Sequence, residues 1–347
     1  MIHSNSEGDI YIEEMPLLLV HLREEEKGAD ARLSEVLSYA LDGYAYETAM
    51  EISAFEDYVN RWRRLEKTQN RKNPVQGRIL FAVPLGTSGI NLELYRLIRF
   101  LREHPDFLNG FVGGLLVDSE NDLYSKSAAK DLVFAANCAG CAFVGRPLVE
   151  GTRTLSNYTI VSNNLGTDLM GAYRESAAGL VKEVLGTDCV RKKCPKVLVL
   201  HASSHKTSNT YAIWNRVKEQ LPEMEIREIG LRNGTLSDCA GCPYKMCLHF
   251  GEQGSCFYGG VMVEDVYPAV READAIVMLC PNYNDALSAN LTAFINRLTS
   301  LFRTTRFYDK ALFAVVVSGY SGSDIVAEQL IAALNMTKPS ICRGSLR

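Results

Sequence analysis

The segment Lys196-Val-Leu-Val-Leu-His-Ala-Ser-Ser-His-Lys-Thr-Ser-Asn-Thr210 decides the fold of the C-terminal half of the chain. Its first part is a continuous apolar run, which predicts a strand buried on both faces of a sheet. Polar residues follow from Ser203 to Thr210, and apolar residues at helical spacing then extend from Tyr211 to Leu221. A strand, a polar loop and a helix in this order are typical of a parallel α/β sheet.

The same alternation continues toward the end of the chain. The patterns predict strands at 225–231, 274–280 and 311–318, of which the last two are buried. They also predict helices at 263–273, 286–301 and 324–334. This half of the chain should therefore form a doubly wound parallel sheet with helices on both faces. Few residues follow the last helix, so a fifth strand must come from residues 340–346 or from the first half of the chain.

The first half is predicted to be a second α/β domain, with strands at 17–22 and 78–83 and helices at 32–41, 55–65 and 91–102. Ile79 precedes Val197 by 118 residues, and Asn91 precedes Asn209 by the same number. The segment 142–147 also resembles 276–281. We expect this domain to be a degenerate copy of the second, although two unrelated α/β halves can share such similarities by chance.

Turn residues and charges at 186–196 mark the boundary between the two domains. We therefore expect an N-terminal domain at 1–190 and a C-terminal domain at 191–347. Residues 1–77 have no counterpart in the second domain, and the sequence assigns them no role.

The composition is that of an ordinary globular protein. Of 347 residues, 47% are hydrophobic and 22% are charged, with a formal net charge of −4. Without a basic excess or cluster, a nucleic-acid partner is not expected. The sequence shows neither a signal-peptide pattern nor an apolar stretch of membrane-spanning length, so we expect a cytoplasmic protein that does not bind membranes.

The loop at 201–210 leaves a predicted strand and enters a predicted helix. Backbone amides and the helix dipole favour an anion at such a position, and this loop is rich in hydroxyl groups, so we expect it to bind a phosphate. The alternative is that Ser208 only caps the helix. The Gly-Lys-Ser/Thr motif of a P-loop is absent.

Two further loops, at 281–290 and 319–322, follow the carboxyl ends of predicted strands. In an open parallel sheet, ligands bind outside these ends. Tyr283 and Tyr320 offer flat aromatic faces, and Gly319 and Gly322 allow close approach of the backbone. Together the three loops predict a site for a planar ring that carries a phosphate.

At this point the residues resemble a known family. Ala-Ser-Ser-His-Lys-Thr-Ser-Asn-Thr at 202–210 is similar to the Gly-Ser-Pro-Arg-x-x-Ser-Asn-Thr signature of the NADPH-dependent FMN reductases and iron–sulfur flavoproteins, which have a flavodoxin-like fold. Pro281-x-Tyr283 and Leu291-Thr-x-x-Ile-Asn-Arg297 resemble their Pro-x-Tyr and Leu-Lys-x-x-Ile-Asp-Arg segments, with Thr292 and Asn296 as departures. The similarity covers residues 196–335.

The resemblance implies a flavodoxin-like domain that binds FMN and transfers electrons. It implies that the phosphate lies on Ser203, His205, Ser208, Asn209 and Thr210, and that the ring lies near Pro281, Asn282, Tyr283, Asn284, Gly319, Tyr320 and Gly322. NAD(P)H would be a transient substrate, because the chain lacks the Gly-x-Gly-x-x-Gly fingerprint of resident dinucleotides. No catalytic side chain is predicted.

Four of the ten cysteines, Cys239, Cys242, Cys247 and Cys256, lie close together in the sequence. They could hold a 4Fe–4S cluster as in iron–sulfur flavoproteins, although their spacing is wider than in that family. They could also remain free or redox-active thiols, or bind zinc. Cys138-Ala-Gly-Cys141 repeats the string at 239–242, but its place at the end of an Ala-rich helix predicts packing cysteines.

We thus expect an FMN-binding oxidoreductase that passes electrons between NAD(P)H or a protein donor and an acceptor, with or without a 4Fe–4S cluster. The alternative is a non-enzymatic binding or sensor module with zinc or free thiols. Because relatives bind FMN at a homodimer interface, the chain should form a homodimer or imitate one internally. The loop at 86–91 has fewer hydroxyl groups than the loop at 201–210, so a second FMN is not expected there.

Overall fold

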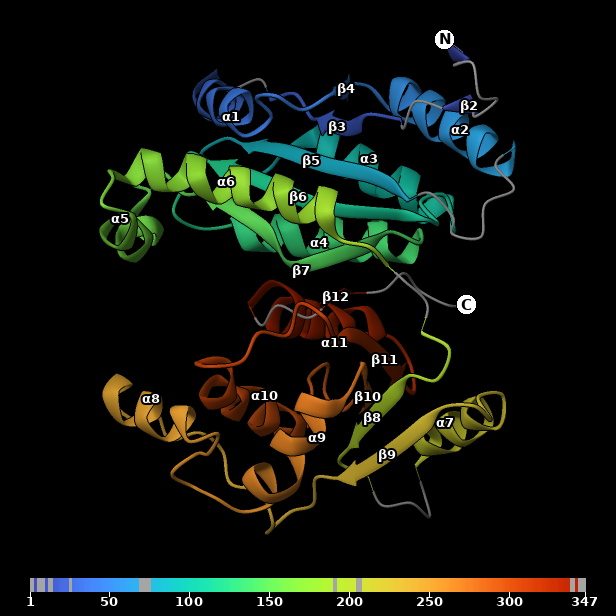
Figure 1. Cartoon of the computed structure of the whole chain (residues 1–347), viewed down its shortest axis with the longest axis vertical. Helices are drawn as coiled ribbons and strands as arrows, with labels where there is room; N and C mark the ends of the chain where they lie inside the picture. Colours follow the sequence, from blue (N-terminus) through green and yellow to red (C-terminus); the bar gives the residue numbers. More distant parts are fainter. Residues whose placement is uncertain are drawn as a thin grey trace. The chain divides into compact units, whose positions relative to one another are not determined.

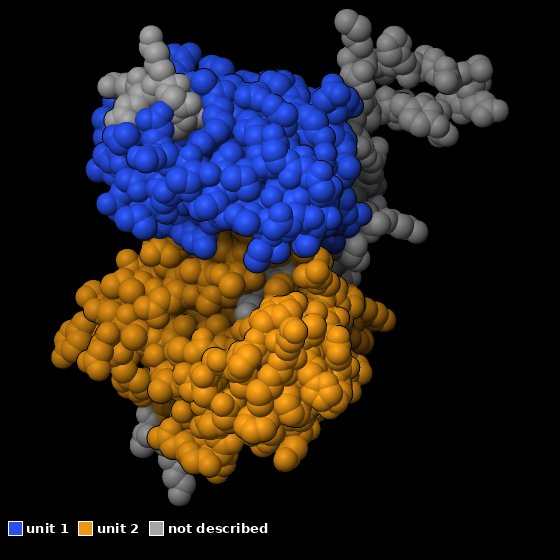
Figure 2. Space-filling model, turned by 90° about the vertical axis from the view of Figure 1, so that its left-hand side faces the viewer, with its two compact units in different colours: residues 1–129, 139–141, 148–188 blue, residues 130–138, 142–147, 189–347 orange. Residues whose placement is uncertain are grey.

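The structure of the protein is a computed structural model that describes residues 3–4, 10–11, 15–24, 27–68, 76–189, 192–203, 208–337 and 341–342 (Figure 1). The chain divides into two compact units, which are coloured blue and orange in Figure 2. The first unit consists of residues 1–129, 139–141 and 148–188. The second consists of residues 130–138, 142–147 and 189–347.

The second unit contains a five-stranded parallel sheet. Its strands are β8 (Lys196–His201), β9 (Glu225–Gly230), β10 (Ala275–Pro281), β11 (Ala311–Val317) and β12 (Ile341–Cys342). They lie in the order β9-β8-β10-β11-β12, and each neighbouring pair is parallel. Counted along the unit, this order is 2-1-3-4-5, which is that of the flavodoxin-like fold. The fold predicted for this half is confirmed.

Both expected sources contribute to the edge of this sheet. β12 supplies the fifth strand and pairs with Ala311 and Leu312 of β11. On its other side, Cys342 pairs antiparallel with Phe143, which belongs to β7 (Ala142–Gly151) and is counted with the second unit.

Helices cover both faces of the sheet because successive strand residues point to opposite sides. Val197 and Val199 of β8 pack in one cluster with Trp214, whereas Leu198 and Leu200 pack in another that contains Phe294. The helical segments are α7 (Asn209–Glu219), α8 (Tyr244–Glu252), η2 (Met262–Val266), α9 (Tyr267–Glu272), α10 (Ala289–Phe302), α11 (Ser323–Leu330) and η3 (Ile331–Thr337).

The prediction of a fully buried strand at 311–318 is wrong for most of its length. Ala311 and Leu312 are buried, but Ala314 is exposed and the remaining residues of β11 are only half-buried. The reason is that β12 is short and pairs with the first two residues of β11 alone among the described residues.

The first unit contains β3 (Leu17–His21), β4 (Tyr46–Ala49), β5 (Gly77–Leu85), β6 (Phe111–Ser119) and the end of β7. These strands lie in the order β4-β3-β5-β6-β7, which is again 2-1-3-4-5. The pairs β3–β4, β3–β5 and β5–β6 are parallel. A separate two-stranded sheet joins β1 (His3–Ser4) and β2 (Ile10–Tyr11).

Helical segments accompany these strands in the described part of the chain. They are α1 (Lys27–Ala40), α2 (Ile52–Thr68), α3 (Leu92–Glu103), α4 (Ser125–Cys138), η1 (Ser156–Tyr158), α5 (Thr159–Leu165) and α6 (Leu169–Gly186). Residues 130–138 of α4 are counted with the second unit. α1 and α6 pack against each other and against β5 and β6. None of the described helices is long and apolar enough to cross a membrane.

The correspondence that the 118-residue offset suggests between the two halves is wrong. It aligns β5 with β8, but counted along the chain β5 is the third strand of its unit, whereas β8 is the first strand of the other. The separate resemblance between 142–147 and 276–281 fails in the same way, because it aligns β7, the fifth strand of its unit, with β10, the third strand of the other. The strand order pairs β3 with β8 instead, so the hypothesis of a degenerate copy now depends on topology and not on the offset.

Candidate functional site

Three loops of the second unit begin at the carboxyl ends of neighbouring parallel strands, β8, β10 and β11. His201 at the end of β8 lies opposite Leu279 of β10, and Pro281 at the end of β10 lies opposite Val317 of β11. Because these strands are parallel neighbours, the loops that follow them meet outside their carboxyl ends. This is where ligands bind in open α/β sheets.

The loop after β8 leads into the N-terminus of α7. The Ser208 hydroxyl accepts a hydrogen bond from the backbone N–H of Tyr211 at 3.2 Å, so this side chain caps the helix as the simpler interpretation predicts. Thr210 is buried and Asn209 is exposed. His205 lies outside the described residues.

Ser203, the first loop residue predicted to contact phosphate, has a buried hydroxyl. Its Oγ has no hydrogen-bond partner among the described residues. Buried polar atoms are nearly always hydrogen-bonded, so an orphan at this position needs an explanation, and a bound ligand group is one.

Asn282 joins the loops after β10 and β11. Its Nδ2 donates to Asp285 Oδ1 at 3.1 Å, to Ser318 Oγ at 3.0 Å and to the carbonyl oxygen of Ser321 at 3.1 Å. Its own N–H donates to the carbonyl oxygen of Val317 at 2.7 Å. The Oδ1 atom of Asn282 is buried and has no partner in the described part of the chain.

Gly322 is required by the geometry of these loops. It has a φ of +85°, and a Cβ atom there would lie 1.9 Å from Asp285 Oδ1. Asn284, with a φ of 57°, also adopts the left-handed conformation. Tyr283 and Tyr320 are exposed, with relative accessibilities of 64% and 102%, so both rings are available to a ligand.

Two further residues support these loops and are not predicted from the sequence. Ser288 precedes α10 as its N-cap but makes no capping hydrogen bond, and its buried Oγ has no partner among the residues described. Gln329 of α11 supports the loop after β10 at both amide atoms, because it accepts from Leu287 N at 3.0 Å and donates to the Asp285 carbonyl oxygen at 3.1 Å. A serine before a predicted helix was a readable signal, whereas Gln329 had none.

Three buried atoms without hydrogen-bond partners among the described residues therefore lie in loops that leave two neighbouring strands. They are Ser203 Oγ, Asn282 Oδ1 and Ser288 Oγ. All three can accept hydrogen bonds, and the two hydroxyls can also donate them. These loops thus combine polar atoms without partners among the described residues, a helix N-terminus and two accessible aromatic rings. This combination fits a ligand that has both an anionic and a planar part. The residues present thus fit the predicted cofactor.

The four cysteines predicted as metal ligands do not form a metal-binding group in the described part of the chain. The described residues contain no group of three or more His, Cys, Asp or Glu side chains that could hold a metal ion. Cys242 Sγ donates to Tyr258 Oη at 4.0 Å. This contact raises the pKa of Tyr258, and the Cys239 and Cys256 thiols act in the same direction.

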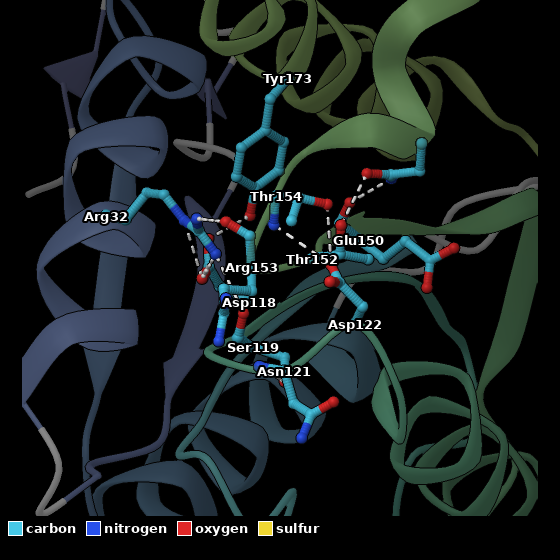
Figure 3. Close-up of polar contacts among 11 residues, drawn as sticks. Arg32, Asp118, Ser119, Asn121, Asp122, Glu150, Thr152, Arg153, Thr154 and Tyr173 are labelled. Carbon is cyan, nitrogen blue, oxygen red and sulfur yellow. Dashed lines mark hydrogen bonds and ion pairs between the residues drawn. The ribbon is translucent and has the colours of Figure 1, made fainter.

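The first unit carries a polar cluster at the carboxyl ends of β6 and β7, which sequence analysis did not find (Figure 3). Asp118 is the residue before the last of β6 and is completely buried. Arg32 of α1 donates to both of its carboxylate oxygens at 2.6–3.1 Å, and the Tyr173 hydroxyl donates to it at 3.0 Å. Arg32 also donates to the backbone oxygens of Ser119 and Arg153.

Burial raises the pKa of the Asp118 carboxyl above its usual value, and hydrogen bonds from Arg32 and Tyr173 act against this shift. Gly151 allows the close packing, because a Cβ atom there would lie 2.6 Å from Asp118 Oδ2. The charged groups of this cluster are thus engaged with one another. It ties α1 and α6 to the end of β6.

Residues 195–344 match the family model of NADPH-dependent FMN reductases. This confirms the resemblance for the second unit, whose strand order and loops had defined a flavodoxin-like domain. A search of curated proteins found no match for the chain. The family supports an FMN-dependent NADPH oxidoreductase in general terms.

Proposed function

We propose that the second unit binds FMN at the carboxyl ends of β8, β10 and β11. The protein would use the bound FMN to pass electrons from NAD(P)H to an acceptor. The observation that supports the proposal is that the loops leaving the neighbouring strands β8 and β10 contain three buried polar atoms, in Ser203, Asn282 and Ser288, without a hydrogen-bond partner among the described residues. Flavin, when bound, accepts two electrons from a nicotinamide and can release them singly or in pairs. The protein residues supply binding and orientation.

The phosphate would lie at the N-terminus of α7. There it would meet the orphan Ser203 hydroxyl and the helix dipole, with His205 and Asn209 as further candidates from the sequence. Because Ser208 already uses its oxygen as an acceptor for the helix cap, it can contribute only its O–H to the phosphate.

The ring would lie between the loops after β10 and β11. The hydrogen bonds of Asn282 hold these loops together before any ligand arrives, and preorganisation of this kind reduces the entropic cost of binding. Asn282 Oδ1, which has no partner among the described residues, would accept an N–H from a ring edge, and Ser288 would offer a hydroxyl. Tyr283 and Tyr320 supply faces for stacking.

We place the flavin in the second unit alone. By strand order, the counterpart of the phosphate loop in the first unit follows β3, where the sequence reads Leu22-Arg-Glu-Glu-Glu26. Three glutamates would repel a phosphate, whereas the loop after β8 contains hydroxyl groups and no acid.

An FMN titration of the purified protein tests the proposal. Ser203→Ala should weaken binding roughly 10- to 100-fold, because a hydrogen bond to a charged group contributes about 1.5–3 kcal/mol. Ser176→Ala, in α6 of the first unit, is the matched control and should bind FMN like the wild type. A wild-type protein that does not bind FMN, or a Ser203→Ala protein with unchanged affinity, would contradict it.

Electron transfer requires a second measurement. Anaerobic mixing of the FMN-loaded protein with NADPH or NADH should bleach the visible absorbance of the flavin. Failure with both nucleotides would leave a flavin-binding protein that takes its electrons from another donor. For a 4Fe–4S cluster or a zinc site, the thiol arrangement among the described residues supplies no argument.

A further inference from the structure

The string Cys-Ala-Gly-Cys occurs twice in the chain, and the structure places its two copies in different environments. In the first copy, Cys141 is fully buried and Cys138 is half-buried. In the second copy, Cys239 is exposed and Cys242 is half-buried. Identical residues thus differ in the access that a reagent has to their sulfur atoms.

The second copy forms an open turn. Gly241 has a φ of +72°, and no atom lies within 4 Å of the position that its Cβ would occupy. The first copy is closed, since a Cβ on Gly140 would lie 2.0 Å from Asn109 Oδ1. Two cysteines separated by two residues can close a disulfide, and an exposed first cysteine is what exchange with another disulfide requires.

A hydroxyl group lies beside the inner cysteine. Cys242 Sγ contacts Tyr258 Oη at 4.0 Å. Tyr258 belongs to an aromatic group in which its ring meets that of Phe257 edge to face, and Phe257 meets Phe250 of α8 in the same way. The half-buried thiol therefore has a hydrogen-bond partner that can stabilise it while the exposed thiol reacts.

Helix α10 holds the segment that carries this pair. Arg297 is buried and donates to the carbonyl oxygens of Ser237 and Gly259, which flank the segment on both sides. Asn296 donates to Asp238 at 3.0 Å, next to Cys239. The segment is therefore anchored at both ends, while the Cys239 thiol stays exposed.

We propose that Cys239 and Cys242 form a dithiol that exchanges with disulfides of small molecules or peptides. Cys239 attacks one sulfur of a disulfide RS–SR, forms a mixed disulfide and releases RSH, with its own proton passing to the leaving sulfur. Cys242 then attacks Cys239 sulfur in the mixed disulfide, releases the second RSH and closes the Cys239–Cys242 disulfide. The substrate gains two electrons and two protons from the protein, and an external dithiol restores the reduced pair.

The test uses the full-length protein, reduced and then freed of reductant under anaerobic conditions, with 2-hydroxyethyl disulfide as the probe. No flavin or nicotinamide is present, so the outcome is independent of the proposed FMN site. Peptide mapping by mass spectrometry should find a Cys239–Cys242 disulfide in the wild type. Cys242→Ser should instead retain a probe adduct on Cys239, because the second step is blocked.

The first copy of the string is the matched control. In the same sample, adducts should form on Cys239 at least about tenfold faster than on Cys138, since access controls the rate of thiol exchange. Cys239→Ser should show no adduct on Cys242, and tryptophan fluorescence establishes that each variant is folded. Equal labelling of Cys239 and Cys138, a disulfide from Cys242 to Cys256, or iron or zinc bound to these thiols in the anaerobically purified protein would overturn the proposal.

Discussion

The ion pair between the half-buried Arg32 and the buried Asp118 yields a prediction that can be worked through in numbers. Arg32→Ala removes the cation from Asp118, whose side chain is 0% exposed, and leaves Tyr173 as its remaining side-chain partner among the hydrogen bonds described. Removal of one partner from a buried pair typically costs 3–5 kcal/mol, because the other charge stays buried. We therefore expect the free energy of unfolding of the first unit to fall by about 3–5 kcal/mol.

The two tryptophans of the chain allow this to be measured. Trp62 is buried in the first unit and Trp214 in the second, so Trp214→Phe leaves one reporter for the first unit. In this background, urea unfolding followed by Trp62 fluorescence gives the change in the free energy of unfolding of the first unit. In a Trp62→Phe background, Trp214 reports on the second unit, whose stability Arg32→Ala should leave unchanged. The exposed pair Arg99–Glu103 is the control, and Arg99→Ala should leave the urea midpoint of the first unit nearly unchanged.

The pH dependence has a definite sign. Burial already raises the pKa of Asp118, and loss of Arg32 removes an opposing contact and raises it further. A carboxyl group with a raised pKa in the folded state binds its proton more tightly there than in the unfolded chain, so stability is lost as the pH rises through that folded pKa. The defect of Arg32→Ala should thus be largest at neutral pH and shrink toward acid. A cost below about 1 kcal/mol at neutral pH, as for a surface pair, would refute the reasoning.

Two glycines give further predictions. Gly322→Ala should weaken FMN binding at least tenfold in the same titration, because its Cβ would strike Asp285 within the ring loops, whereas Gly319→Ala, with open space around it, should have little effect. Gly114→Ala should destabilise the first unit by about 1–3 kcal/mol in urea unfolding, because its Cβ would lie 2.8 Å from Val184. Gly179→Ala, in an exposed position of α6, should instead stabilise the same unit by roughly 0.5–1 kcal/mol. Equal effects of Gly322→Ala and Gly319→Ala, or of Gly114→Ala and Gly179→Ala, would show that the space around an added Cβ does not govern these positions.

Local patterns predicted most elements of the second unit, because its strands β8 and β10 are continuous apolar runs and its long helices have a regular apolar spacing. The same patterns missed β6, a central strand of the first unit. Gly113 and Gly114 lie in its middle and weaken the strand signal, but Gly114 is needed there because Leu180 and Val184 of α6 pack against it. The reason for that glycine lies in a helix far along the chain.

The candidate site divides in the same way. Gly322 was predicted from its loop and Asn282 from the family resemblance, and the structure shows the close approach and the hydrogen bonds that involve them. Ser208 and Ser288 both precede a helix, but only Ser208 makes the capping hydrogen bond. The Ser288 hydroxyl has no partner among the described residues, and the sequence does not show this difference. The spacing of the four cysteines likewise did not predict how their thiols lie in space.

The two units show why strand order alone does not locate a ligand site. Both have the order 2-1-3-4-5, and each places polar groups at the carboxyl ends of its strands. In the first unit, Arg32, Asp118 and Tyr173 bond with one another, so the carboxylate charge is already neutralised within the protein. In the second unit, the polar atoms of Ser203 and Asn282 at the equivalent edge have no partner among the described residues. Because a buried polar atom without a partner costs roughly 1–3 kcal/mol, the second edge gains from a polar ligand and the Asp118 cluster of the first does not. Hydrogen-bond satisfaction, rather than strand order, therefore distinguishes the unit in which we propose an FMN site from the first unit.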